Sequence, residues 1–444
     1  MEMSSQLKSN VAFLMYHPLK QRQKNNSFEG NYNIGANVII DVLKRNNIEC
    51  DFCTVDTADK YKIVLVSFTS DFDCISFYQS VALLPTWQPT KRSFCVIGGG
   101  EGMQNPTVIR NYVDYGVFGR AENIIVDLVD CVLGGKLFEH ESVMNLPELH
   151  DVKVAQARDL YPYEIKLGGE KKKTWNESFI GCPNKCLFCH YSWSRKWIGG
   201  DTYHQGDLTL RRSSEILWKD IQAITSKEGR IRSAIDGSSE RLRMAYGKKI
   251  TNKEVIDGID HLGSFDGITV LMVYNISNMP HETQKDRDEL YGIVKQANPK
   301  NRVIVVFQST PFRASLLTPL MFAPVRLFPC TSDLRAQAIY DSDNLRVMHS
   351  FSNEGAYSQL QTMIVNRATP ETDKLFHTIC FHPKMRNGTA RKRVKRLESS
   401  FDLSQYLKEY GVEEKHPAWF LSSYASRGIL KSTYLKAEAK LGYL

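Results

Sequence analysis

The sequence predicts an α/β protein with more than one domain, on three observations. Its 444 residues exceed the roughly 150 residues of an average domain, so two or three domains are expected. Short apolar runs alternate with helical periodicity from about residue 10 to 135 and again from about 175 to 325, as in parallel sheets joined by crossover helices. With 42% hydrophobic and 24% charged residues, the chain is neither wholly disordered nor a fibrous repeat.

The first alternating region ends one of its strands in a run of glycines. Strands are predicted over residues 11–15, 48–55, 63–67 and 94–97, with helices at about 36–43, 74–84 and 124–132. The strand at 94–97 runs into Gly98, Gly99 and Gly100. An open α/β sheet binds ligands at the carboxyl ends of its strands, where glycine lets a bulky group approach the backbone. An ordinary tight turn is the alternative interpretation.

The second alternating region follows a connector of weaker periodicity. A helix is predicted after Ser213, and another after Thr251, whose capping-box partner is Glu254 three residues later. Strands at 268–274 and 302–307 flank a helix at 284–296. The predicted division is residues 1–140, a connector at 141–174, residues 175–330, and a mixed, largely helical region with a basic segment at 331–444.

The net charge of +8 is concentrated in one segment near the carboxyl end. A segment with this many basic residues indicates either a contact with a phosphate backbone or, more commonly, a solvated helix face. No apolar run approaches the roughly 18 residues of a membrane span, and the first residues lack a signal-peptide pattern, so a cytoplasmic protein without membrane association is expected. The nucleic-acid candidates in the basic segment are Arg391, Lys392, Arg393, Lys395 and Arg396.

Three of the ten cysteines, Cys182, Cys186 and Cys189, have C-x3-C-x2-C spacing after a predicted strand. Three thiolates on one short loop can hold three irons of a [4Fe-4S] cluster and leave the fourth iron open. A zinc site that adds His190 is the alternative, although adjacent residues rarely point at one metal. Cys50 and Cys53 lie three apart in a predicted strand, which places them on opposite faces and disfavours joint chelation.

This cysteine spacing, with Phe188 just before the last cysteine, resembles the radical S-adenosylmethionine (SAM) superfamily. Residues 234–243 and 247–251 are similar to the A-P-E-x-G-[ST]-E-R-L-R and N-K-G-x-T blocks of members that carry a cobalamin-binding domain, and 279–283 to their G-L-P-x-E-T block. The resemblance implies SAM contacts from Phe188, Ser238, Ser239 and Glu240. Only 50 positions separate Cys189 from Ser239, so either the barrel is abridged or this block occupies an earlier strand end.

The first region resembles the cobalamin-binding module of the same proteins. Ser67-Phe68-Thr69 matches its S-x-[LT] step and Gly98-Gly99 its glycine pair, whereas its D-x-H-x-x-G element is absent around His17. The resemblance implies a Rossmann-like domain, then a partial TIM-type (β/α) barrel, then the mixed carboxyl-terminal region. It also implies that cobalamin contacts come from Ser67, Thr69, Gly98, Gly99 and Gly100.

The resemblance implies an enzyme that uses a [4Fe-4S] cluster to cleave SAM reductively to a 5′-deoxyadenosyl radical, with cobalamin-dependent methyl transfer to an unactivated carbon. A flavodoxin- or ferredoxin-like reductant is the expected partner. One alternative is a radical SAM isomerase or oxidative enzyme without methyl transfer. The other is a nucleic-acid-binding protein with a structural metal cluster.

Overall fold

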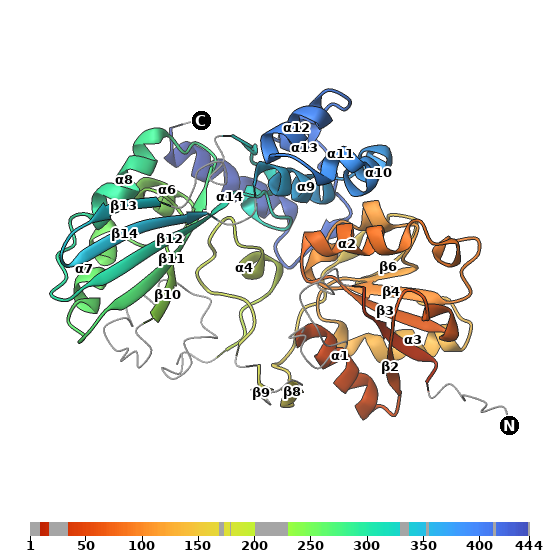
Figure 1. Ribbon diagram of the computed structural model, residues 1–444. Helices are drawn as coiled ribbons and strands as arrows, with labels where there is room; N and C mark the ends of the chain where they lie inside the picture. Colours follow the sequence, from red (N-terminus) through yellow and green to blue (C-terminus); the bar gives the residue numbers. More distant parts are fainter. Residues whose placement is uncertain are drawn as a thin grey trace.

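The computed structural model describes residues 9–16, 34–167, 173–177, 179–199, 230–328, 337–351, 355–411 and 414–442. Two mainly parallel sheets lie at opposite sides of the molecule, with a short helix, α4 (His190–Ser194), between them and a group of carboxyl-terminal helices above (Figure 1). The predicted α/β class is confirmed. The helix predicted after Ser213 and the loop at His17 lie outside the described residues.

The first sheet has the order β2-β1-β3-β4-β5-β6, and its first five strands are parallel. The central strands are continuous apolar runs because both of their faces are buried. Helices α1 (Ile34–Arg45) and α3 (Ile125–Leu133) cover one face, and α2 (Asp71–Val81) covers the other. The strands are β1 (Val11–Leu14), β2 (Cys50–Cys53), β3 (Ile63–Ser67), β4 (Cys95–Gly99), β5 (Tyr115–Val117) and the antiparallel β6 (Val143–Asn145).

The second sheet has the order β10-β11-β12-β14-β13, with the first four strands parallel and in chain order, as in a partial barrel. One face packs under α7 (Asn252–Leu262) and α8 (Gln284–Val294). The predicted capping box of α7 is confirmed, since Glu254 N–H donates to Thr251 Oγ1 at 3.1 Å and Thr251 N–H to Glu254 Oε2 at 2.8 Å. The strands are β10 (Arg230–Ala234), β11 (Thr269–Ser277), β12 (Val303–Pro311), β13 (Gln337–Asp341) and β14 (Leu345–Phe351).

Both sheets extend beyond the predicted domain boundaries. Strand β6, from the predicted connector, forms the edge of the first sheet, and β13 and β14, from the predicted carboxyl-terminal region, complete the second. Added edge strands pair backbone groups that a shorter sheet would leave exposed. In the same connector, β7 (Val152–Lys153) pairs with β15 (Leu421–Ser422), and β8 (Ile165–Leu167) pairs with β9 (Lys173–Trp175).

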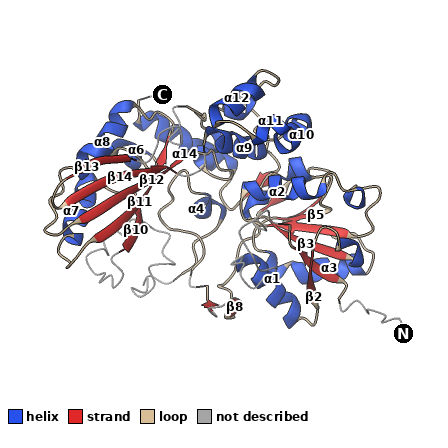
Figure 2. Cartoon of the chain, in the orientation of Figure 1, coloured by secondary structure: helices blue, strands red, loops and turns tan. Residues whose placement is uncertain are grey.

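The carboxyl-terminal helices join the two halves (Figure 2). The largest apolar core runs from the α2 face of the first sheet into these helices, and Arg110 forms a two-bond ion pair with Asp373 at 2.6 and 2.8 Å. The fully buried Arg367 guanidinium donates to four backbone carbonyls. The helices are α9 (Ala356–Asn366), α10 (Asp373–Phe381), α11 (Pro383–Arg386), α12 (Ala390–Glu398), α13 (Ser404–Leu407) and α14 (Arg427–Lys440). Across the described ranges, no helix combines the length and apolar character needed to cross a bilayer.

Candidate active site

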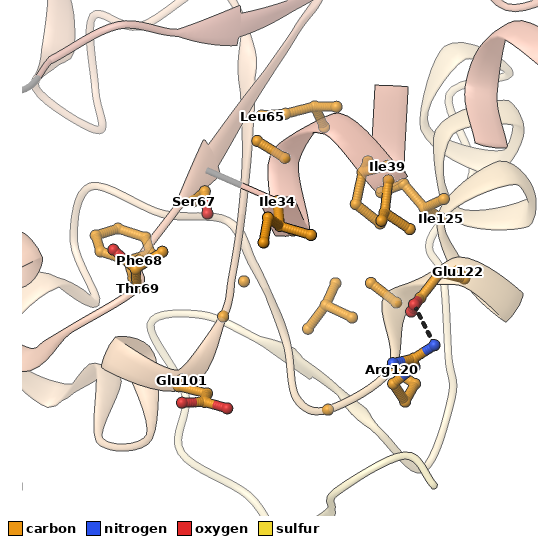
Figure 3. Close-up of a pocket in the computed structure, with 18 of the residues that line it drawn as sticks. Ile34, Ile39, Leu65, Ser67, Phe68, Thr69, Glu101, Arg120, Glu122 and Ile125 are labelled. Atoms are coloured by element: carbon orange, nitrogen blue, oxygen red, sulfur yellow. Dashed lines mark ion pairs between the residues drawn. The ribbon is translucent and has the colours of Figure 1, made fainter. Parts of the chain in front are cut away.

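A cavity of about 480 Å³ opens at the carboxyl ends of β3, β4 and β5 (Figure 3). All five predicted cobalamin contacts, Ser67, Thr69, Gly98, Gly99 and Gly100, are among its lining residues. Apolar side chains from α1, α3 and β3 gather on one side of it, and charged side chains lie on the other. Its volume lies in the range of small-molecule sites, which suits a heterocyclic group held between sheet and helices.

The three glycines differ in what surrounds them. A Cβ atom at Gly100, where φ is +117°, would lie 2.2 Å from the Phe68 carbonyl oxygen, and one at Gly98 would lie 2.9 Å from Met103 Sδ. These two glycines are therefore required by the protein's own packing. Gly99 pairs with Ser67 on β3 and with Val117 on β5, and all three residues line the cavity. The space next to Gly99 is the part of the glycine run that suits a ligand.

Thr69 has a structural role at the start of α2. Its hydroxyl and its N–H both donate to Asp73 Oδ2 at 2.6 Å, and Ser70 N–H donates to the same oxygen at 3.0 Å. This carboxylate caps the helix and fixes the turn after β3. The Thr69 hydroxyl is thus bonded within the turn, while its residue still forms part of the cavity wall.

Charged residues at the rim of the cavity connect the first domain to the segment that carries the cysteines. Arg120, after β5, bonds Glu177 at 2.6 Å and Glu122 at 2.8 Å, and Arg195, just after α4, pairs with Glu101 after β4. Burial raises the pKa of Glu122. These ion pairs fix the cysteine-bearing segment against the cofactor-sized cavity.

Cys182, Cys186 and Cys189 lie on one loop that precedes α4. Ile180 and Ile198 close the base of this loop with two backbone hydrogen bonds of 2.8 and 2.9 Å. Cys186 is buried, whereas Cys182 and Cys189 are partly exposed, and all three are free thiols. The structure places the three cysteines on one loop, and both their sharing of one site and their ligand role stay predictions.

The thiols lie within electrostatic reach of one another. Burial raises the pKa of Cys182, and the charge of Cys189 raises it further. Burial also raises the pKa of Cys186 to about 12. Thiols in this state become thiolates when a metal displaces their protons. Three cysteine thiolates are the donor type that a [4Fe-4S] cluster takes.

The zinc alternative does not agree with the position of His190. Its Nδ1 lies 2.9 Å from the Leu316 carbonyl oxygen, and its Nε2 lies 3.1 Å from Gln104 Nε2. Both ring nitrogens are therefore engaged away from the cysteines. Among the described residues, no three or more Cys, His, Asp or Glu side chains are grouped so that they could hold one metal ion.

Helix α4 links the cysteine loop to the cavity of the first domain. Cys189 directly precedes this helix, Tyr191 lies on it and Arg195 follows it, and the last two residues line the cavity. Five residues span only about 7.5 Å of helix. A group bound by the cysteines and a group bound in the cavity would therefore be neighbours.

The predicted SAM contacts after β10 are bonded inside the protein. Ser238 donates to Glu282, Ser239 donates to Asp286 at 2.6 Å, and Glu240 accepts from Asn252 N–H at 2.6 Å at the start of α7. Ser238 and Ser239 are only 2% and 0% exposed. The Ser238–Glu282 contact joins two of the three sequence blocks of the resemblance, and all three contacts support a role in positioning the strand ends.

Phe188 differs from these three residues because it lies inside the cysteine loop. It is partly buried and packs against the largest core. Its aromatic ring therefore contributes to the packing between the cysteine loop and this core.

Several contacts around the cysteine loop join segments that are distant in the sequence. The buried Lys248 forms an ion pair with Asp236 at 2.6 Å, on the turn that packs against Cys186. From the carboxyl-terminal region, Tyr424 hydroxyl donates to the Ser192 carbonyl at 2.8 Å and also contacts Lys185 of the loop. The partners are separated by up to 239 positions, so local pattern could not reveal them.

A further polar cluster lies where the first domain, the second sheet and the carboxyl-terminal helices meet. Asp71 begins α2, Arg313 follows β12 and Asn366 ends α9. Burial raises the pKa of Asp71 to about 7, against the opposing effects of Arg313 and Asn366. This buried carboxyl therefore interacts with residues from two other parts of the fold.

The predicted nucleic-acid residues lie on α12, and three of the five have structural contacts. The guanidinium of Arg391 lies 4.8 Å from the Phe328 ring centre and that of Arg393 lies 4.1 Å from the Tyr357 ring centre. Arg396 donates to two carbonyls at the end of α11. Lys392 and Lys395 are exposed. Arg391 is exposed as well, so three of the five predicted residues have exposed charges, and their nucleic-acid role stays a prediction.

The prediction for Cys50 and Cys53 is confirmed. Cys53 belongs to the core on the α2 face of the first sheet, and Cys50 packs against the core on the opposite face. The two thiols therefore do not share a site.

No protein-family model and no curated protein matches this chain. Among solved structures, it is similar to the apo, selenomethionine-labelled form of the cobalamin-dependent S-adenosylmethionine radical enzyme OxsB, with 11% identity, a TM-score of 0.33, and coverage of 98% of this chain and 62% of that one. The form of OxsB with aqua-cobalamin and S-adenosylmethionine bound has 11% identity, a TM-score of 0.29, and coverage of 98% and 61%. The chain thus spans about 62% of the length of the first of these structures.

Proposed function

We propose that this chain is a radical SAM enzyme that holds a [4Fe-4S] cluster on Cys182, Cys186 and Cys189 and binds cobalamin through its first domain. The observation that carries the proposal is the placement of α4, which joins the cysteine loop to the cavity lined by the predicted cobalamin residues. When bound, the cluster would supply the electron that cleaves SAM to a 5′-deoxyadenosyl radical, and cobalamin would carry the methyl group. The proposed reaction is methyl transfer to an unactivated carbon.

The chain's own residues would position these groups. The cysteine loop would supply the three thiolates, while the apolar wall formed by Ile34, Ile39 and Ile125 would keep water away from a heterocycle bound in the cavity. The Arg120 and Arg195 ion pairs hold both parts in one arrangement. The electron would come from a flavodoxin- or ferredoxin-like protein.

The cluster is tested by anaerobic reconstitution with iron and sulfide, followed by addition of SAM and dithionite. We expect about four irons per chain, and release of 5′-deoxyadenosine by the wild type. Cys186→Ser should lose both, whereas Cys131→Ser, which removes a partly exposed free thiol on α3, should keep both. A wild type that binds iron but forms no 5′-deoxyadenosine would contradict the catalytic proposal and favour a structural cluster.

The cofactor of the first domain is tested with hydroxocobalamin. The wild type should retain corrin absorbance after gel filtration, and Ile39→Trp, which fills the cavity, should not. Ile40→Trp, one position along α1 and outside the cavity lining, is the matched control. Once titanium(III) citrate has reduced the bound cofactor to cob(I)alamin, SAM with a deuterated methyl group should yield labelled methylcobalamin and S-adenosylhomocysteine. Retained cobalamin without label transfer would favour the radical enzyme without methyl transfer.

A further inference from the structure

Lys248 is a buried cation beside the cysteine loop. The residue as a whole is only 5% exposed, and its ammonium group lies 2.6 Å from Asp236 Oδ2. Burying an ammonium group is costly unless it is paired. The protein therefore maintains a charge at this point, and the position of that charge relative to the thiols defines what it can do.

The backbone around Lys248 packs directly on the loop. Leu187 N–H donates to the Tyr246 carbonyl at 2.9 Å, and the Cys186 thiol lies 3.7 Å from the Gly247 carbonyl oxygen. The next residue along this turn is Lys248, whose N–H is fixed by a 2.8 Å bond to the Arg243 carbonyl. The ammonium group is thus held to one side of the cysteines by backbone bonds and by Asp236.

The charges of the two regions act on each other. Burial lowers the pKa of Lys248, but the negative charges of Asp236, Cys186 and Cys189 outweigh it, and the pKa lies above its ordinary value. Lys248 is thus a cation in the field of all three thiols.

We propose that the Lys248–Asp236 ion pair sets the reduction potential of the group bound by the cysteines, with Lys248 raising it and Asp236 lowering it. This inference rests on the proposed function. Adding one electron to a [4Fe-4S] cluster increases its negative charge by one, so a nearby cation favours the reduced form and a nearby anion the oxidised form. Neither residue is a ligand, and both act through the field at the cluster.

The test is an EPR-monitored redox titration of the reconstituted protein with dithionite, in the absence of SAM and substrate. Lys248→Met should disfavour reduction about tenfold, which is a potential lower by about 59 mV for one electron. Asp236→Asn should shift the potential in the opposite direction by a similar amount. Asparagine keeps the shape of the side chain and tolerates the φ of +47° at this position. Asp236→Asn therefore tests the inference even if Lys248→Met does not fold.

Two further variants separate charge from packing. Lys248→Arg keeps the cation, so its equilibrium constant for cluster reduction should stay within a factor of two of the wild-type value. Lys249→Met removes the exposed neighbouring cation, and its equilibrium constant should also stay within a factor of two. Shifts of the reduction potential in opposite directions in Lys248→Met and Asp236→Asn support the inference, because structural damage would not change direction with the charge that is removed. If the cluster forms but both variants have the wild-type reduction potential, this inference alone is overturned. A wild type that takes up no cluster overturns the proposed function as well.

Discussion

The cavity of the first domain and the cysteine loop are adjacent, yet they are built differently. The cavity is formed by strand ends and the helices that follow them, so most of its wall comes from consecutive strand–turn–helix units. The cysteine loop is short and has only five helical residues after it, and it is held by Tyr246, Leu320 and Tyr424, which come from three remote segments. One site is a property of local units, and the other is a property of the assembled chain.

This difference indicates where each site is vulnerable. A substitution inside a strand–turn unit should damage the first-domain cavity and leave the cysteine loop largely intact. A substitution in the carboxyl-terminal region should instead affect the cysteine loop, although it is more than 200 positions away in the sequence. The predictions below test this division.

The largest effect is expected at the glycine turn of the cavity. Gly100→Ala should destabilise the protein by about 4 kcal/mol, because it combines a disallowed backbone angle with a 2.2 Å approach to the Phe68 carbonyl. Gly135→Ala also changes a positive-φ glycine but meets nothing within 4 Å, so it should cost only about 1 kcal/mol. Chemical denaturation measures both, and equal losses would refute the role of the close contact.

The second sheet contains a buried histidine and should respond to pH through it. His349 is 5% exposed, contacts Ser309 Oγ at 2.7 Å and Tyr291 hydroxyl at 2.5 Å, and burial lowers its pKa to about 4. The unfolded chain takes up this proton near pH 6.5 and the folded chain near pH 4, so stability falls as pH falls through this window.

The loss attributable to His349 between pH 6.5 and pH 4 is about 3 kcal/mol. His349→Gln should remove this part of the pH dependence, measured as the difference between the two proteins in urea unfolding at each pH. Parallel curves for the variant and the wild type would show that His349 is not the group responsible.

A smaller effect is expected where the carboxyl-terminal region supports the cysteine loop. Combining Tyr424→Phe with Ser423→Ala removes the hydroxyls that donate to the Ser192 and Trp193 carbonyls at 2.8 and 3.1 Å, at a cost of about 2 kcal/mol. Iron should be lost faster from the reconstituted variant, with cobalamin retention unchanged. Tyr163→Phe, at an exposed tyrosine, is the control. Loss of cobalamin in place of iron would reverse the proposed division.

The smallest effect is expected on α12. Lys392→Glu combined with Lys395→Glu should change the free energy of unfolding by less than about 0.5 kcal/mol, because both side chains are exposed. If α12 also binds nucleic acid, the same variant should weaken binding to a single-stranded oligonucleotide and flatten its dependence on salt. Unchanged oligonucleotide binding would show that Lys392 and Lys395 of α12 do not contact nucleic acid.

The sequence predicted well what depends on neighbouring residues. The strands that end in Ser67 and Gly99, the capping box of Thr251 and the opposite faces of Cys50 and Cys53 all follow from local periodicity. Contacts between distant segments could not be predicted from the sequence. The role of Lys248 depends on a fold that brings Asp236 and Cys186 together.

The hydroxyls of Ser238 and Ser239 illustrate the same limit. Their type and position suited ligand contacts, but Glu282 and Asp286, more than 40 positions later, accept their hydrogen bonds. The strands β13 and β14 were likewise missed as members of the second sheet, because their pairing partners lie in another part of the chain. Side-chain partners at this separation have no periodic signal.

The most direct test of the central claim is whether the two proposed cofactors occupy adjacent sites in one chain. The protein would be reconstituted with iron and sulfide, loaded with cob(II)alamin, and examined by EPR before and after reduction of the cluster. Because α4 is about 7.5 Å long, we predict that cluster reduction splits or broadens the cobalamin signal, and that Cys186→Ser abolishes this change. A spectrum that is the simple sum of two independent signals would contradict the account.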